Sequence, residues 1–404
     1  MKLYLFLTNT IGGCSGGVTY VRNKLVWLQK RGWDVVVYDA GGQVSESVLF
    51  TELMRFLCNR NFELYYPPCF FTQRRRNAVV NRIANKHKYK SQVVVESNTI
   101  NLALWGEMIA SSLKAKHLIY LIQENLIIQT KEQFDYLNYK AKNKELFSIN
   151  TQAYELLFSK YEEVKDADNH YWEASNASPI LDIENERLNN IPRADINISH
   201  FGRKKDYFHY MINEVKSFAE SHPKTQINFL LLGIESFKKN GYVFSDNLNI
   251  IPLGNMNPVP SLFYKISNVV IATAGCASMS FKYGAKVISM DTSECKPLGV
   301  MGFTTLDRTY RTVGNNNNKD LSVLLEELLI KDLYKGEPPM RLPAPQKSYD
   351  YQNSFATMPP SQYYNTTSVG APKTLRDYRD WVMLRMGLVK LRTLLRYWAF
   401  RNSK

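Results

Sequence analysis

Short apolar runs recur along the chain and alternate with segments whose apolar residues repeat at helical spacing. Residues 3–7 and 35–38 are runs of the kind that buried parallel strands require. Between them lies a helical pattern with apolar residues at intervals of three and four: Val18, Val21, Leu25 and Leu28. The amino end therefore predicts a strand, a turn, a helix and a second strand.

The turn after the first strand is rich in glycine. It contains Gly12, Gly13, Gly16 and Gly17. Glycine lets a ligand approach the backbone closely, and the first amides of the following helix carry partial positive charge. This arrangement suits a phosphate or a sugar hydroxyl. The spacing matches neither G-x-G-x-x-G nor a P-loop, so a tight turn without a ligand is the alternative.

The α/β alternation continues to Asn190 and resumes after Ile191-Pro192-Arg193-Ala194, which predicts a hinge. Further strands are expected at residues 93–96, 117–122 and 147–149, and then at 195–201, 227–232, 248–252, 269–272 and just after Gly284. Polar residues follow several of these strands, at the sheet edge where open α/β folds bind ligands. The pattern predicts two Rossmann-like, doubly wound domains that face a cleft, residues 1–192 and 193–335.

Two different segments follow. Residues 336–373 hold seven of the sixteen prolines and predict an extended or disordered tether with little core of its own. Thr374 and Asp377 then resemble a capping box that starts a helix reaching about Arg401. At about 100° per residue its apolar side chains fall in one arc: Trp381, Leu384, Leu388, Leu391, Leu395 and Trp398. Residues 374–404 are therefore expected to form a basic amphipathic helix.

The formal net charge of +14 predicts an anionic partner, and residues 375–404, with eight Lys and Arg and two Asp, supply nearly half of it. An apolar stripe bordered by cations fits a helix in the headgroup region of an anionic leaflet. The expected membrane contacts are Trp381, Arg385, Leu388, Arg392, Leu395, Arg396 and Trp398. The alternatives are a helix packed on the folded domains or in a dimer seam. No nucleic-acid recognition motif accompanies the charge, so nucleic acid is not expected as a partner.

The five cysteines are an odd number without a C-x-x-C pair, which predicts reduced thiols and no metal site. No signal-peptide core is expected at the amino end, and no apolar run approaches the roughly 18 to 20 residues of a spanning helix. The expected location is the cytoplasm, peripheral on the inner face of the cell membrane. The oligomeric state is left open.

These motifs resemble those of glycosyltransferases with the GT-B fold, nearest to family 4 and to bacterial transferases that build surface polysaccharides. The glycine turn and helix of residues 12–38 are similar to the opening of their acceptor domain, and Leu121-Ile122-Gln123-Glu124-Asn125 to a strand end at their cleft. Phe201-Gly202-Arg203-Lys204-Lys205 is similar to the positions that hold the donor diphosphate, and Leu232-Gly233 and Pro252-Leu253-Gly254 to the glycine turns that follow. The resemblance spans about residues 1–335 and implies acceptor binding by the first domain and nucleotide-sugar binding by the second.

One departure from family 4 concerns its two glutamates in an E-x7-E pattern. The corresponding interval here, TAGCASMSFKYGAKVI, contains no acid. Its small residues are closer to the phosphate-gripping turn of other GT-B enzymes, which implies an amide cradle at Gly275, Cys276, Ala277 and Ser278. The donor ribose is then assigned to Glu294. Retaining or inverting chemistry stays open.

The implied reaction transfers a hexosyl or deoxyhexosyl group from a nucleotide-diphosphate sugar to a lipid-linked or growing glycan acceptor, without a metal cofactor. Arg203 and Lys205 are expected to neutralise the leaving diphosphate, and Glu124 to act as general base if the reaction inverts. The other donor-binding candidates are Gly202, Lys204, Gly233, Gly254, Gly275, Cys276, Ala277, Ser278 and Glu294. The acceptor-binding candidates are Gly12, Gly13, Gly16, Gly17, Asn98, Trp105 and Gln123.

Several alternatives stay open. Arg203 is also compatible with a solvated surface arginine, Glu124 with a capping acid, and Trp105 with a core position. Among enzymes, a nucleotide-sugar epimerase of the same fold or a transferase with a soluble acceptor fits the same motifs. Outside enzymes, a catalytically silent GT-B relative that binds glycan or scaffolds a membrane complex fits the missing glutamates.

Overall fold

A computed structural model describes residues 2–9, 16–41, 58–123, 126–161, 170, 184–237, 242–256, 258–307, 317–342, 359–372, 374–388 and 391. The chain forms two compact units. The first comprises Met1–Ser175 with Pro345–Lys404, and the second Asn176–Ala344. The second unit thus includes residues 184–192, which the sequence places with the first domain. Leu188 packs in the second unit's core, and Asn228 Nδ2 donates to Pro192 O at 2.7 Å.

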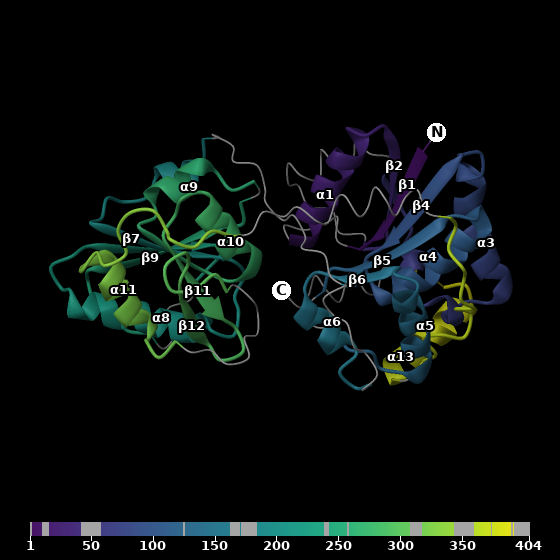
Figure 1. Ribbon diagram of the computed structural model, residues 1–404. Coiled ribbons are helices and arrows are strands. Elements are labelled where there is room, and N and C mark those ends of the chain that lie inside the picture. The colour runs from purple at the N-terminus through teal and green to yellow at the C-terminus, as the bar shows by residue number, and fades with distance from the viewer. Residues whose placement is uncertain are drawn as a thin grey trace. The chain divides into compact units, whose positions relative to one another are not determined.

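The first unit is built on a six-stranded parallel sheet in the order β3-β2-β1-β4-β5-β6 (Figure 1). Its strands are β1 (Lys2–Thr8), β2 (Trp33–Asp39), β3 (Cys58–Arg60), β4 (Gln92–Ser97), β5 (Lys116–Leu121) and β6 (Leu146–Ser148). Its helices are α1 (Gly16–Gln29), α3 (Gln73–His87), α4 (Ile100–Leu113), α5 (Lys131–Lys142) and α6 (Thr151–Leu157), with short 3-10 turns η1 (Phe62–Tyr65) and η2 (Pro68–Phe70).

Helices cover both faces of this sheet because its strands are apolar on both sides. Side chains alternate along β1, so Leu3 and Leu5 pack in a cluster with residues of α3 and α4. Tyr4 and Phe6 point to the opposite face, in a cluster with residues of α1. A sheet covered on both faces is the doubly wound arrangement that the sequence predicts.

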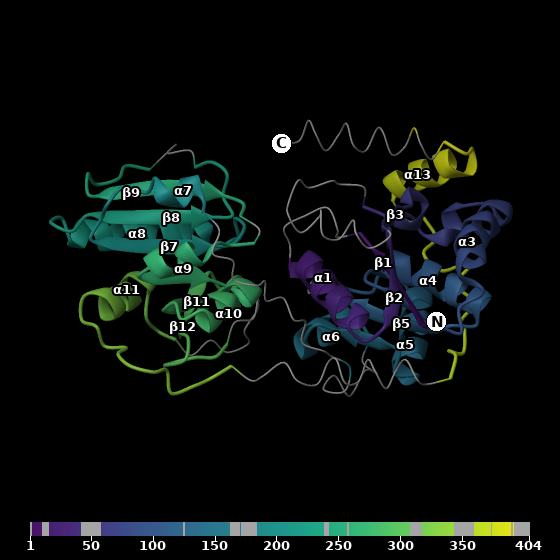
Figure 2. The ribbon, with the colours of Figure 1, turned by 90° about the horizontal axis from the view of Figure 1, so that it is seen from above.

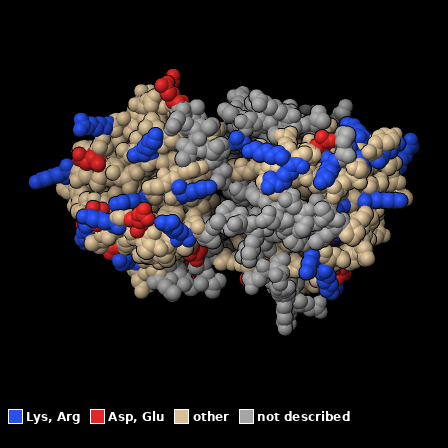
Figure 3. Space-filling model, turned by 45° about the horizontal axis from the view of Figure 1, so that its top comes forward, with Lys and Arg blue, Asp and Glu red and all other residues tan. Residues whose placement is uncertain are grey.

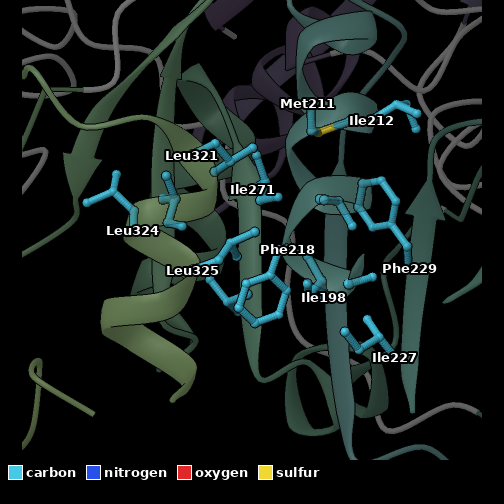
Figure 4. Close-up of a cluster of buried hydrophobic side chains, with 14 of the residues drawn as sticks. Ile198, Met211, Ile212, Phe218, Ile227, Phe229, Ile271, Leu321, Leu324 and Leu325 are labelled. Carbon is cyan, nitrogen blue, oxygen red and sulfur yellow. The ribbon is translucent and has the colours of Figure 1, made fainter. Parts of the chain in front are cut away.

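The second unit has its own six-stranded sheet in the order β12-β11-β10-β7-β8-β9, parallel except for β12. Its strands are β7 (Ile196–Phe201), β8 (Ile227–Leu232), β9 (Leu248–Gly254), β10 (Val269–Ala272), β11 (Val287–Asp291) and β12 (Lys296–Val300). Its helices are α7 (Glu186–Asn189), α8 (Phe208–Ser221), α9 (Ser261–Ile266), α10 (Ala274–Lys282) and α11 (Leu321–Leu329). Figure 4 shows Leu321, Leu324 and Leu325 of α11 meeting the strand and α8 side chains in one apolar cluster.

A buried ionic cluster lies between α4, α5 and the strands β5 and β6. Glu107 accepts from His117 Nδ1 at 2.5 Å and from Lys140 Nζ at 3.0 Å, and Lys140 also contacts Glu145. Burial acts to raise the pKa of Glu107. The hydrogen bond from His117, with the charges nearby, outweighs burial and lowers that pKa to about 2. The remaining carboxylate oxygen atoms of Glu107 and Glu145 need further hydrogen-bond donors.

The segment 359–372, yellow in Figure 1, supplies those partners. Ser361 donates to Glu145 at 2.5 Å and accepts from the backbone of His117 at 2.8 Å, and the Tyr364 amide donates to Glu107 at 2.7 Å. Thr366 and Val369 are buried. The prediction of a tether with little core of its own is therefore wrong for this segment, because buried carboxylates of the first unit require its donors.

The tail helix is shorter than predicted. α13 (Leu375–Arg385) begins with the capping box of Thr374 and Asp377, as the sequence indicates. It ends in a Schellman motif, because Gly387 has φ +78° and its amide donates to Leu384 O, while the Leu388 amide donates to Met383 O. A single helix from 374 to about 401 is therefore wrong. Arg392, Leu395, Arg396 and Trp398 lie outside the described residues.

The face of α13 that bears the tryptophan packs inward. Leu384 is buried and Trp381 half-buried in the core cluster of α3 and α4, and Arg385 donates to Cys69 O in η2. The prediction that Trp381 contacts a membrane is therefore wrong, and packing on the folded domain, the alternative, holds for this helix. Within the described residues no helix has the length and apolar character needed to cross a membrane.

Candidate functional site

The order of the second sheet reverses between β7 and β10. The chain leaves β7 toward β8 and β9 on one side, and then returns to place β10 and β11 on the other. In open α/β sheets, ligands bind outside the carboxyl ends of the strands at such a reversal. The loop after β7, residues 202–205, and the N-cap and first turn of α10 after β10, residues 273–278, flank this reversal. The sequence had predicted donor contacts in both.

The loop after β7 lies very close to the loop after β8. Gly233 has φ +96°, and a Cβ atom built on it would lie 2.4 Å from Gly202 O. The Gly202 amide in turn donates to Leu232 O at 3.0 Å. Glycine at 233 is therefore required by both backbone conformation and space. Its role is to let the Gly202 loop sit against the sheet.

Replacing Gly233 with alanine should destabilise the second unit more than replacing Gly284 does. Both glycines have positive φ, +96° and +81°, but only Gly233 has backbone atoms in the way of a Cβ. Strain of this kind costs about 1–3 kcal/mol, and the contact with Gly202 adds to it in G233A. Urea unfolding followed by circular dichroism measures the difference. Equal losses in G233A and G284A would contradict the close approach.

Two cations of the first loop reach the start of α10. Arg203 is exposed and makes no ion pair with the described residues, and Lys205 is half-buried. Burial raises the pKa of the Cys276 thiol to about 11, while Lys205 and Arg203 act in the opposite direction. Both cations therefore lie within electrostatic reach of the first turn of α10. The contact of these residues with a donor stays a prediction.

The start of α10 is strained and has an unpaired hydroxyl. Ala274 has φ +50°, which is unusual for a residue with a side chain. Thr273 occupies the N-cap position but makes no capping bond, and its buried Oγ1 has no partner among the described residues. The first amides of a helix also lack intrahelical partners. Thr273, which belongs to the predicted turn but was not among the predicted donor contacts, thus adds a hydroxyl to an anion-binding arrangement.

Two predicted members of this cradle are used inside the helix. The Ala277 amide donates to Thr273 O at 3.3 Å, and the Ser278 hydroxyl donates to Ala274 O at 3.2 Å. Ala277 is also fully buried. The Ser278 hydroxyl therefore donates its proton within the helix, and the prediction that it donates to a ligand is wrong. Gly275 and Cys276 remain the amides available at this turn.

The carboxyl end of β9 adds two groups that the sequence did not single out. Arg187 of α7 donates to Leu253 O at 2.8 Å, and Glu235 accepts from both nitrogen atoms of Asn255. Both side chains flank Gly254, where a Cβ atom would lie 2.2 Å from Arg187 Nη1 and 2.7 Å from Glu235 Oε2. Because Gly254 has no side chain, Arg187 and Glu235 fit beside it at the carboxyl edge of the second sheet.

The last predicted donor contact, Glu294, lies in the turn after β11. Asp291 at the end of that strand accepts from Ser293 N and Oγ, both at 2.7 Å, and so shapes the turn. Glu294 is exposed. It belongs to the same sheet edge as the other candidates, because β11 runs parallel to β10. Its role toward a ribose stays a prediction.

His200 lies beside the Gly202 loop and is inaccessible to solvent. It is fully buried at the end of β7, with Nδ1 3.3 Å from Ile271 O. Burial lowers its pKa to about 4, against the opposing effect of the backbone of Ile271, Gly202 and Arg203. The neutral ring is therefore part of the packing between β7 and β10.

The first sheet also reverses, between β1 and β4, and the predicted acceptor contacts gather at its carboxyl edge. Gly16 and Gly17 begin α1, Asn98 follows β4 and Gln123 follows β5, where it is exposed. Gly12, Gly13 and Glu124 lie outside the described residues. Trp105 is fully buried and its Nε1 donates to Tyr66 O at 2.7 Å. The prediction that Trp105 contacts an acceptor is therefore wrong.

Beneath this edge lies a buried ion pair that the sequence analysis did not identify. Glu96 at the end of β4 contacts Lys24 of α1, and both side chains are inaccessible to solvent. Tyr4 and Tyr20 donate to the same carboxylate at 2.6 and 3.0 Å. Burial lowers the pKa of Lys24, and the charge of Glu96 opposes this effect.

Asn98 is oriented by the same network. Its Nδ2 donates to Glu96 Oε1 at 3.1 Å and to Tyr120 O at 3.2 Å, which assigns the amide orientation. Its Oδ1 has no partner among the described residues. Asn98 is buried, and its remaining hydrogen-bonding capacity is that of an acceptor at Oδ1.

Comparison with known proteins supports the fold through structure alone. The sequence matches no protein-family model and has no significant match among curated proteins. The alignment with a glycosyltransferase from Rickettsia africae covers 98% of this chain and 97% of that protein, with a TM-score of 0.53 and 14% sequence identity. The alignment with Anabaena HepE, in complex with UDP and glucose, covers 97% of this chain and 100% of HepE, with a TM-score of 0.51 and 12% sequence identity. The alignment with the lipopolysaccharide outer core galactosyltransferase WaaB covers 95% of this chain and 99% of WaaB, with a TM-score of 0.50 and 11% sequence identity.

These likenesses extend over nearly the whole of each chain at low sequence identity, so they concern the fold. The resemblance to family 4 in particular stays a prediction. This chain has two parallel-dominated sheets, each reversed at its centre, and its fold matches those of the neighbours over nearly their full length. The chain has the two-domain, Rossmann-like GT-B fold.

Proposed function

We propose that this protein is a glycosyltransferase that moves a sugar from a nucleotide-diphosphate sugar to a lipid-linked or growing glycan acceptor. The observation that carries the proposal is the convergence of Arg203, Lys205 and the unpaired start of α10 at the reversal of the second sheet. Structures of the same fold that contain UDP, or UDP and glucose, lend support. Surface-polysaccharide synthesis is the proposed setting.

The proposed chemistry follows from charge at this edge. Breaking the bond between a sugar and a nucleoside diphosphate leaves negative charge on the diphosphate, which must be stabilised as it develops. Arg203 offers a planar fork of donors for phosphate oxygens, and the amides of Gly275 and Cys276 point outward at the positive end of the α10 dipole. Thr273 Oγ1 supplies one more hydrogen bond. Participation of a metal ion is not expected, and this too stays a prediction.

The acceptor side of the proposal uses the carboxyl edge of the first sheet. Asn98 Oδ1 would accept a hydrogen bond from an acceptor hydroxyl, and Gln123 offers a second polar group. Glu124, next to Gln123, remains the proposed general base if the anomeric centre inverts. Whether the sugar is a hexosyl or a deoxyhexosyl group is not specified by these residues.

Isothermal titration of the full chain against UDP, GDP, dTDP and CMP tests the donor assignment. We expect saturable binding of one nucleoside diphosphate, and we expect its sugar conjugates to release nucleotide in the presence of acceptor. Epimerisation of the sugar without an acceptor would instead identify the nucleotide-sugar epimerase. Glycan binding without nucleotide binding would identify the catalytically silent relative, and either result would overturn the proposal.

We also propose that the protein works on the inner face of the cell membrane as a peripheral protein. The support is the basic tail, which contributes nearly half of the net charge of +14. Basic side chains predominate over acidic ones on the face drawn in Figure 3, and they are spread over both units. A lipid-linked acceptor would be presented at such a surface.

A further inference from the structure

α13 has two apolar rows on different sides, and among the described residues only one of them packs into a hydrophobic core. Trp381 and Leu384 pack inward on the first unit. The other row, which we call the outer row, consists of Leu375, Tyr378, Val382 and Met386, whose exposed fractions are 91, 53, 44 and 62%. At about 100° per residue these four positions fall within about 80° of one another. The protein therefore exposes a continuous apolar strip along a helix.

Arginines surround the outer row. Arg379 and Arg385 border the strip on its two sides, Arg376 lies farther round the helix beyond Arg379, and all three are exposed. Of the acids of the helix, Asp377 serves the capping box, and Asp380 is buried with its Oδ1 3.5 Å from Arg379 Nε. The helix thus presents apolar side chains and cations together on its outward side.

Further cations adjoin the same end of α13. Arg385 donates to Cys69 O in η2, which directly precedes the Arg74-Arg75-Arg76 run of α3. Burial raises the pKa of the Cys69 thiol to about 11, and Arg76 and Arg385 both oppose this, which places them near one another. Figure 2 shows α13 on the side of the first unit that carries β3 and α3.

We infer that the outer row of α13, with its flanking arginines, is the surface by which this protein binds an anionic phospholipid bilayer. The inference deepens the membrane association proposed above and rests on it. An apolar strip bordered by arginines complements both parts of such a surface, because the strip enters the acyl boundary while the guanidinium groups meet lipid phosphates. Of the tryptophan stripe that the sequence indicates, Trp381 and Leu384 form the inner, packed side of this helix, whereas Leu388 and Leu391 are exposed.

A matched pair of variants tests the inference, Val382→Glu and Val323→Glu. Both valines lie on helices and are 44% exposed, but Val323 is on α11 of the second unit. The full chain is sedimented with vesicles of phosphatidylglycerol and phosphatidylcholine, and with phosphatidylcholine alone. We expect V382E to weaken binding to anionic vesicles at least tenfold, because it places a carboxylate against lipid phosphate, and V323E to bind like the unaltered protein. UDP titration of each variant shows whether its donor site is intact.

Three outcomes would overturn the inference. Equal loss in V382E and V323E would show a general charge effect, and unchanged binding in V382E would show that lipid meets another surface. Self-association of the unaltered protein that V382E abolishes, without vesicle binding, would make the outer row an interface between two copies. In each case normal UDP binding would leave the transferase proposal standing. Trp381→Phe is a second check: it should lower thermal stability without weakening vesicle binding.

Discussion

Alanine at position 203 is expected to lower sugar transfer by about 10²- to 10³-fold, the usual loss when one preorganised donor to a developing negative charge is removed. The loss should fall mainly on the rate of the chemical step, because Arg203 is placed to meet charge that grows as the diphosphate leaves. Nucleotide release from the donor sugar that the titration identifies is the measurement. Donor affinity should fall by a smaller factor.

Lys282→Ala is the control for the charge change. Lys282 is the last residue of α10 and is exposed. K282A therefore removes one positive charge from the same helix, at the end opposite to Cys276. Its activity should stay within about twofold, because an exposed charge at that distance is largely screened. Normal turnover in R203A, or equal losses in R203A and K282A, would mean that Arg203 is a solvated surface residue.

The strands of both sheets could be predicted where they are buried on both faces. The expected strands at residues 227–232 and 269–272 coincide with β8 and β10, and 93–96 falls within β4 (Gln92–Ser97). Such strands are uninterrupted apolar runs, so their composition alone marks them. The donor-site residues follow from the same logic, because the residues after each run lie at one edge of a parallel sheet.

Two strands that were not predicted lie at the edges of the sheets. β3 (Cys58–Arg60) is three residues long, and β12 (Lys296–Val300) pairs antiparallel with β11. Neither contains an apolar run: β3 is only three residues long, and β12, although buried from Pro297 to Val300, has its apolar residues interrupted by Gly299. Both form because the adjacent strand offers unpaired backbone groups, which is a property of the folded sheet and leaves little trace in the local sequence.

The tail shows a different limit. Gly387 is visible in the sequence, but a glycine within an apolar pattern does not by itself state whether the helix ends there. α13 also carries two apolar rows, and which of them packs inward depends on its contact with η2, about 300 residues earlier in the chain. Periodicity alone therefore could not show that Trp381 and Leu384 pack on the first unit.

The buried ion pair of Lys24 and Glu96 could not be predicted either, because its two residues are far apart in the sequence. Lys24 lies three residues after Val21 and four before Leu28, which places it on the apolar face of α1. That position was a signal that the lysine is buried. Its partner is 72 residues away in the chain, so no local pattern could identify it.

Glu96→Gln is expected to destabilise the first unit by about 3–5 kcal/mol, because it removes the counter-charge of a lysine that solvent cannot reach. The side chain keeps its size and can still bond the Tyr4 hydroxyl, so packing is little changed. All six tryptophans, at positions 27, 33, 105, 172, 381 and 398, belong to this unit. Tryptophan fluorescence during urea unfolding therefore reports on it alone.

The double variant K24M/E96Q separates the charge from the network around it. Replacing both partners removes the uncompensated ammonium group, so most of the loss in E96Q should be recovered. Glu155→Gln, an exposed carboxylate on α6, should change the free energy of unfolding by less than about 0.5 kcal/mol. A double variant as unstable as E96Q would show that the tyrosine and Asn98 hydrogen bonds, and not the ion pair, hold this edge together. An E96Q loss no larger than that of E155Q would show that the pair is not buried in solution.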